Sequence, residues 1–161
     1  MTIGVTHVDD AEQLIRRVPA VGGCFKSIAP IELSSTAFND RSHKPSVDRL
    51  RMKASSDDCK LQPTDGLVML IAGEVRAIDG GIVMGANNKP LVDASGNPTG
   101  ETYRIDVLHR PIEASATTKE NAAHTQIETT PAPGRSPFER IKERLARLAD
   151  TRGWIVEPKP P

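Results

Sequence analysis

The sequence predicts an α+β fold, in which a small, mostly antiparallel sheet is accompanied by two or three short helices and by a C-terminal amphipathic helix. Two observations lead to this class. Short apolar and β-branched runs, separated by Gly, Pro and Asn, fill residues 80–111, which is typical of β-hairpins. A later segment, residues 136–152, has apolar positions three and four residues apart, as in a helix with one buried face.

The first predicted element is a short helix over residues 9–18. Asp9 or Asp10 can cap it, and Glu12 stands where a capping box places its glutamate. Pro19 ends the segment. The apolar positions that recur at helical spacing are Val8, Ala11, Ile15 and Val18.

The next elements are expected to be short. One or two strands are predicted at residues 24–26 and 31–33, and Ser46 can cap a helical turn that runs to Met52. The apolar residues 67–78 fit a helix and a buried strand equally well, since periodicity alone does not separate the two. The clearest strand lies at residues 103–108, and His124 opens a second apolar alternation.

The C-terminal unit has the clearest secondary-structure signals in the chain. Ser136, Pro137 and Glu139 together match a helix start, and Gly153 is a helix stop before a short strand. An apolar stripe follows the predicted helix and consists of Phe138, Ile141, Leu145 and Leu148. We predict a compact domain at 1–128, a Pro- and Thr-rich linker at 129–135 and this unit at 136–161. The stripe can dock on its own body or on a partner protein.

Composition excludes several classes of function. The 161 residues carry 21 basic and 21 acidic side chains, so no global field attracts nucleic acid or an anionic membrane. The longest apolar run is far shorter than the ~20 residues of a membrane span, so no membrane partner is expected. The N-terminus lacks the pattern of an export signal, and the two cysteines have no CxxC spacing. A cytoplasmic location, reduced thiols and no cofactor are therefore expected.

The segment 41–53 is the strongest functional hint in the sequence. It contains five arginines and lysines against a single acid, Asp48, together with several serines. Guanidinium forks beside hydroxyl groups can hold a phosphate or a carboxylate. We therefore predict an anion site formed by Arg41, Ser46 and Arg49. The alternative is a solvated basic loop that ends in a capped turn.

Three histidines are candidates for acid-base catalysis. His43 lies in the basic segment, His109 follows the predicted strand at 103–108, and His124 starts the next one. Histidines near arginine can serve as general acid and base in phosphodiester chemistry. The alternative is that each ring hydrogen-bonds to backbone. Their spacing matches no metal-binding motif, so no metal is expected, and no Walker loop, GxGxxG, HExxH or nucleophile elbow is present.

Four short blocks together resemble a group of short uncharacterised bacterial proteins. The blocks are Ser34-Ser35-x-Ala37-Phe38, Ser46-Val47-Asp48, His109-x-Pro111 and Asn121-x-Ala123-His124. The resemblance covers about a third of the chain and implies a bacterial or mobile-element setting. It also implies that residues 80–100 are an added hairpin. It supplies no activity, so no functional residue is carried over.

The leading hypothesis is a small accessory or interaction protein of the bacterial cytoplasm, possessing no complete catalytic motif and acting through contacts with another protein. The competing hypothesis is an enzyme or binder of nucleotide or nucleic-acid phosphate, with Arg41 and Arg49 as anion clamps and the three histidines as acid-base residues. The sequence does not decide whether the protein is an enzyme.

Overall fold

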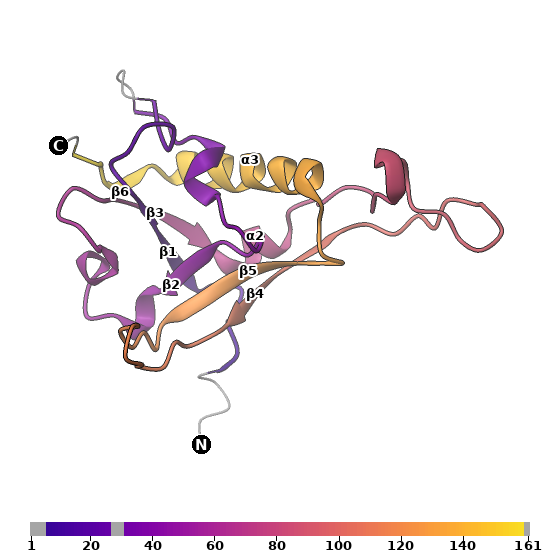
Figure 1. The fold of residues 1–161 in the computed structure, drawn as a ribbon. Helices are drawn as coiled ribbons and strands as arrows, with labels where there is room; N and C mark the ends of the chain where they lie inside the picture. Colours follow the sequence, from indigo (N-terminus) through magenta and orange to yellow (C-terminus); the bar gives the residue numbers. More distant parts are fainter. Residues whose placement is uncertain (1–5, 27–30, 160–161) are drawn as a thin grey trace.

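The computed structural model describes residues 6–26 and 31–159. Its centre is one antiparallel sheet of six strands in the order β4-β5-β2-β1-β3-β6 (Figure 1). The strands are β1 (Gln13–Val18), β2 (Ser46–Arg49), β3 (Gly66–Ile71), β4 (Arg104–His109), β5 (His124–Thr130) and β6 (Trp154–Val156). The helix α3 (Arg135–Arg152) lies across one face of the sheet, which we call the helix face. The other face is called the open face.

The α+β class is confirmed, but there are fewer helices than expected. In the described part of the chain α3 is the one long helix, and α2 (Ala72–Arg76) has only five residues. Within residues 31–159 the remaining helical pieces are single 3-10 turns, η1 (Ser35–Phe38), η2 (Leu50–Met52), η3 (Ser56–Cys59) and η4 (Ala86–Asn88). The ambiguous residues 67–78 divide between the two states: β3 occupies the first part and α2 the second.

The helix predicted for residues 9–18 was wrong, because this segment forms β1. β1 pairs along its length with β3 and also with β2, so neighbours on both sides satisfy its backbone groups. Leu14 and Val18 face the main core while Ile15 packs on the other side, as strand alternation requires. The capping signal was real, since Asp9 and Glu12 hydrogen-bond to each other, but it closes a turn before the strand.

Two other local predictions differ from the structure. Ser46 starts strand β2 rather than capping a helical turn, and only Leu50–Met52 is helical, as η2. Val47 is buried between β1 and β5, and this packing favours the extended state. At residues 24–33 the described backbone forms one isolated bridge, Phe25 to Leu33, in place of regular strands, and residues 27–30 lie outside the described ranges.

The C-terminal helix is confirmed and belongs to the main core. Phe138, Ile141 and Leu145 are buried against the sheet and against η1, and the partly buried Leu148 packs at the margin of the same cluster. Its N-cap is Gly134, two residues before the predicted Ser136. Gly153 ends it with φ 80°, and β6 then pairs with β3. The segment after the expected linker therefore adds a helix and a strand to the body.

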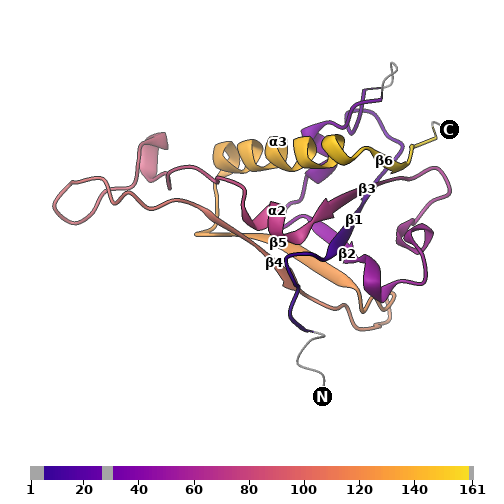
Figure 2. The ribbon, with the colours of Figure 1, turned by 180° about the vertical axis from the view of Figure 1, so that it is seen from behind.

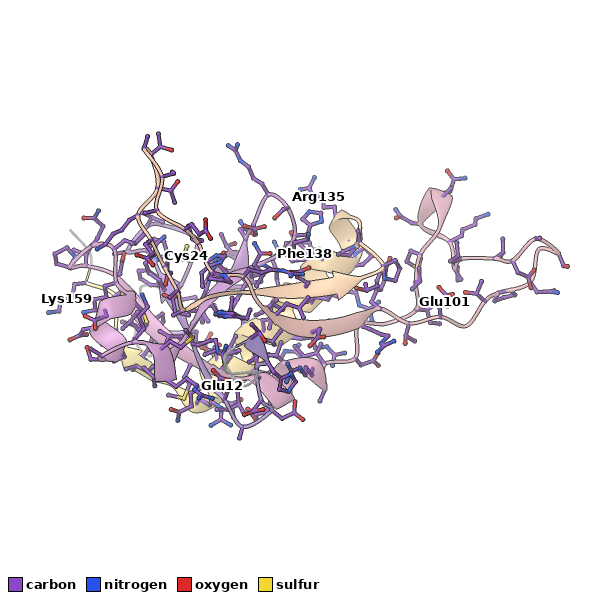
Figure 3. All side chains as sticks on the ribbon, turned by 90° about the horizontal axis from the view of Figure 1, so that it is seen from below. Glu12, Cys24, Glu101, Arg135, Phe138 and Lys159 are labelled. Atoms are coloured by element: carbon purple, nitrogen blue, oxygen red, sulfur yellow. The ribbon has the colours of Figure 1, made fainter. Side chains whose placement is uncertain are left out.

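Residues 80–102 form an arm that projects from the body. In Figure 1 the arm extends beyond the end of α3, and Figure 2 shows the same projection from behind. Backbone hydrogen bonds hold it as a narrow hairpin, with Val83 N donating to Glu101 O at 2.8 Å and Thr99 N to Leu91 O at 2.9 Å. Figure 3 labels Glu101, which is part of the arm, and shows Glu12 well away from it in the body.

The open face is covered only in part. The loop that carries η2 and η3 places Cys59 and Leu50 over Ile15 and Leu67, forming a second, small core. The rest of this face, over β2, β5 and β4, carries polar side chains. Within the described ranges no helix is long and apolar enough to cross a membrane.

Replacing Leu145 with alanine tests the packing of α3. Leu145 is fully buried, so the variant should lose about 2–5 kcal/mol of unfolding free energy in urea denaturation. Leu61 is the matched control, because it is 73% exposed and its alanine variant should change stability by less than about 0.5 kcal/mol. Equal losses in the two variants would contradict the packing described here.

Candidate functional site

A groove of about 430 Å³ on the open face is the candidate site. It lies where β2 and β5 meet the loop that follows η2 and the loop that precedes β5. Its lining includes Ser46, Asp48, Cys59, Asn121 and His124. Sheet register brings these residues together, since Asp48 pairs directly with His124 across the β2–β5 ladder. Cross-strand partners project from the same face of a sheet.

Ser46 is held on a rigid element. It is the first residue of β2 and pairs with Gln126 of β5. Arg16 donates from Nη1 to the Ser46 carbonyl oxygen at 2.7 Å and from Nε to the Ala37 oxygen at 2.9 Å. Burial lowers the pKa of Arg16 to about 10, which still leaves the guanidinium charged at neutral pH. The backbone of Ser46 is thus fixed by a charged donor from the neighbouring strand.

His124 points one ring nitrogen at Ser46. Its Nε2 lies 2.9 Å from the Ser46 Oγ, and its Nδ1 lies 2.7 Å from the carbonyl oxygen of Arg110. A carbonyl oxygen can only accept, so the Nδ1 carries the hydrogen in this bond. In the neutral ring the Nε2 is then the unprotonated nitrogen and accepts from the Ser46 hydroxyl. The backbone N–H of Arg110 also donates to the His124 carbonyl at 2.9 Å, which holds the backbone of His124 in place.

A second polar group adjoins this pair. The Asn121 amide donates to Asp48 at 2.8 Å, and the Cys59 thiol also hydrogen-bonds to Asp48. Burial, together with the Asp48 charge, raises the pKa of Cys59 to about 12. Because only the thiolate is a good nucleophile, Cys59 is unreactive at neutral pH. Its place in the groove is that of a donor to a carboxylate.

The charge of the groove is mixed. Its basic side chains are Arg16, Arg17, Lys53, Lys60 and Lys119, and its acidic ones are Asp48, Asp58 and Glu120. Part of the excess of positive charge is engaged within the chain, because Arg16 donates to backbone carbonyls and Arg17 lies 3.4 Å from Asp65. Lys60 lies 3.6 Å from Asp57, a weak pair.

The three predicted histidines do not lie in one common site. His124 lines the groove, whereas His43 donates from Nδ1 to the Pro133 oxygen at 3.0 Å and stacks on Phe138 with ring centroids 4.4 Å apart. His109 ends β4, and its Nδ1 is buried with no hydrogen-bond partner among the described residues. Burial and, second, the Arg49 charge lower the pKa of His109, so it is neutral at pH 7.

The predicted anion-binding residues are also dispersed. Ser46 lines the groove, and Arg41 is exposed in the turn before it. Arg49 is fully buried, and its guanidinium contacts both carboxylate oxygens of Glu12, with Nη2 donating to Oε2 at 2.9 Å and to the His7 carbonyl at 2.9 Å. Arg49 thus already neutralises a carboxylate of its own chain. The anion-binding role of the three residues stays a prediction.

The stripe predicted to bind a partner is occupied within the chain. Phe138, Ile141 and Leu145 are each at most 4% exposed, and Leu148 packs beside them. The sequence left two docking modes open, on the chain's own body or on a partner protein. In the structure the stripe docks on the chain's own body.

Sequence reasoning named Ser46 and His124 but did not pair them. They are 78 positions apart, and only the register of β2 against β5 joins them. It missed Asp48, Cys59 and Asn121 as groove residues and the Arg110 carbonyl as the group that orients the ring. The one available signal was that the blocks Ser46-Val47-Asp48 and Asn121-x-Ala123-His124 each stand at the start of a strand.

A larger hollow, of about 990 Å³, runs along the free edge of β4. Arg76 contacts two of its carboxylates, Asp10 at 2.7 Å and Asp106 at 2.8 Å. Arg76 also donates to the Val107 carbonyl on this edge. The guanidinium in this hollow is therefore already engaged within the chain.

No cluster of three or more histidine, cysteine, aspartate or glutamate side chains suited to a metal ion occurs in the ranges 6–26 and 31–159. Comparisons of the chain with protein-family models, with curated proteins and with solved structures find no match. Function therefore has to be inferred from the geometry alone.

His109 makes stability depend on pH. Its pKa is lowered in the folded protein, so acid favours the unfolded chain, in which histidine binds a proton near pH 6.5. Its contribution is complete above that pH and declines as the pH falls below it. His109→Gln should therefore lose less unfolding free energy than the wild type between pH 7.5 and pH 5, measured by urea denaturation. Parallel curves for the two proteins would contradict this assignment.

Proposed function

We propose that the protein is an accessory protein that acts by binding another protein through the arm, residues 80–102. One observation carries this proposal: between residues 84 and 102 no side chain is buried in the chain itself, although the backbone is hydrogen-bonded into a hairpin. The proposal places the contact on the arm rather than on the stripe of α3.

The conformational entropy that the arm loses on ordering, compared with the little apolar surface that it buries, supports a partner. Ordering one residue costs roughly 1–2 kcal/mol of conformational entropy, and an isolated two-stranded hairpin is marginally stable in water. The arm recovers little of this cost by burial, since Ile82 and Val92 are each 51% exposed. A partner that covers these two side chains would supply the missing apolar burial.

The base of the arm is fixed to the body. Tyr103 is 5% exposed, and its hydroxyl accepts from the backbone N–H of Met84 at 3.1 Å. Gly80 is packed so closely on Tyr103 that a Cβ atom there would lie 2.6 Å from the Tyr103 carbonyl oxygen. Gly81 has φ 79° and lies beside the Arg140 guanidinium of α3. The arm is therefore presented in a defined direction, which lowers the entropy lost on binding.

The composition of the arm favours a protein partner over nucleic acid. It contains Lys89 as its one basic residue, against Asp93 and Glu101, and it has no aromatic side chain. Nucleic-acid binding needs clustered cations for phosphates or aromatic rings for stacking. Apolar side chains with a few charges of both signs are typical of a contact with another protein.

Shortening the arm tests this proposal. Residues 84–100 are replaced with Asn-Gly, a two-residue hairpin turn that joins the hydrogen-bonded positions Val83 and Glu101. Full-length and shortened proteins are used to capture partners from a bacterial lysate, and each captured protein is then purified and its affinity measured by calorimetry. We expect a partner whose affinity falls at least tenfold when the arm is shortened.

Two point variants separate the arm from the rest of the surface, one as the test and one as its control. Val92→Asp should weaken the same complex, whereas Leu61→Asp, which changes an exposed apolar side chain on the body, should leave it unchanged. Light scattering separates a second copy of the chain from a different partner protein. Binding that is equally strong with and without the arm would overturn the proposal.

A further inference from the structure

We propose that Ser46 and His124 form a nucleophile and base that cleave small carboxylic esters bound in the open-face groove. This activity does not depend on the arm, so the failure of one proposal leaves the other in place. It rests on the contacts of the two side chains and on the groove around them.

The three groups have the arrangement of an activated serine. A serine hydroxyl is a weak nucleophile until a neighbouring base accepts its proton, and that base must in turn be oriented by a third group. The Ser46 Oγ lies 2.9 Å from the His124 Nε2, and the Arg110 carbonyl orients the ring from the far side at 2.7 Å. Because the carbonyl requires the hydrogen on Nδ1, the Nε2 is the free base in the neutral ring.

The pair is both held and accessible. The Arg16 guanidinium and the β2–β5 ladder fix the backbone of Ser46, and Arg110 fixes His124 by two contacts. Both side chains are half-buried and line the groove. A reactive group on a strand, supported by a second layer of contacts, keeps its geometry better than one on a loop.

Ser46 is also the best nucleophile in the groove. The pKa of Cys59 is raised to about 12, so its thiol is protonated at neutral pH. Asp48 is engaged by Asn121 and by that thiol. The Ser46 hydroxyl is therefore the group in the groove that is best placed to act as a nucleophile.

The groove sets the class of substrate. A volume of about 430 Å³ lies within the range of small-molecule sites. Ile112 and Leu61 supply apolar wall, and the two arginines of the lining, Arg16 and Arg17, are already engaged by oxygens of the chain. A small ester with a short aliphatic acyl group therefore fits better than a highly charged phosphate. This choice of substrate separates the proposal from the phosphate chemistry suggested by the basic segment.

The reaction follows from these positions. The Ser46 Oγ attacks the ester carbonyl carbon while its proton moves to the His124 Nε2. Collapse of the tetrahedral intermediate breaks the bond to the ester oxygen, and the Nε2 returns the proton to the departing alcohol. Water then attacks the acyl-serine with the Nε2 again as base, which releases the carboxylic acid and restores the hydroxyl.

A fluorophosphonate probe tests the nucleophile directly. The serine oxygen displaces fluoride from such a probe and keeps the phosphonyl group, which peptide mass spectrometry locates. We expect modification at Ser46 of the full-length protein, no modification at that peptide in Ser46→Ala, and a rate at least tenfold lower in His124→Gln. Ser95→Ala and His7→Gln, which change exposed residues, are the matched controls and should retain the wild-type rate.

Hydrolysis of p-nitrophenyl acetate should show the same dependence on Ser46 and His124, with melting curves confirming that each variant is folded. Modification of Ser46 no faster than that of Ser95, or a rate that His124→Gln leaves unchanged, would overturn the proposal. In either case the contact is a structural hydrogen bond only.

Discussion

The rest of the structure depends on the buried pair of Arg49 and Glu12, which joins several elements of the sheet. Arg49 ends β2 and is fully buried, and its guanidinium contacts both carboxylate oxygens of Glu12 just before β1. Its backbone N–H donates to the Ala123 carbonyl, one residue before β5, and the Glu12 carbonyl accepts from Ala72 at the start of α2. A buried charge is tolerated only when it is paired, so these contacts fix β1, β2, β5 and α2 at one end of the sheet together.

This junction also sets the position of the groove. Fixing Arg49 beside Ala123 sets the register of β2 against β5, and that register places Ser46 and His124 on the open face. The helix α3 fills the helix face, so the apolar stripe of α3 is buried in the core. The groove and the arm remain at the surface, together with the hollow along β4. The same sheet thus carries the arm at one edge and a polar groove on one face.

Some of this could be predicted from the sequence because the signals are local. The stripe of α3 and the stop at Gly153 lie within one element, and β4 has a clear alternation. β1 was mistaken for a helix because Val8, Ile15 and Val18 recur at helical spacing, whereas in the strand Ile15 and Val18 lie on opposite faces and both are buried; pairing with two neighbouring strands decided for the extended state. The contact of Ser46 with His124 depends on strand register across 78 positions, which no local pattern encodes. Arg49 was read as an anion clamp for the same reason, since its partner Glu12 lies 37 positions away.

A double-mutant cycle on Glu12 and Arg49 tests the central role of this pair most directly. Glu12→Leu and Arg49→Met each remove one partner of the buried ion pair, and each should lower the unfolding free energy in urea by about 3–5 kcal/mol. The double variant buries no unpaired charge and should be more stable than the sum of the two losses predicts, by at least about 1 kcal/mol. Single losses below about 0.5 kcal/mol, or losses that simply add, would contradict the account.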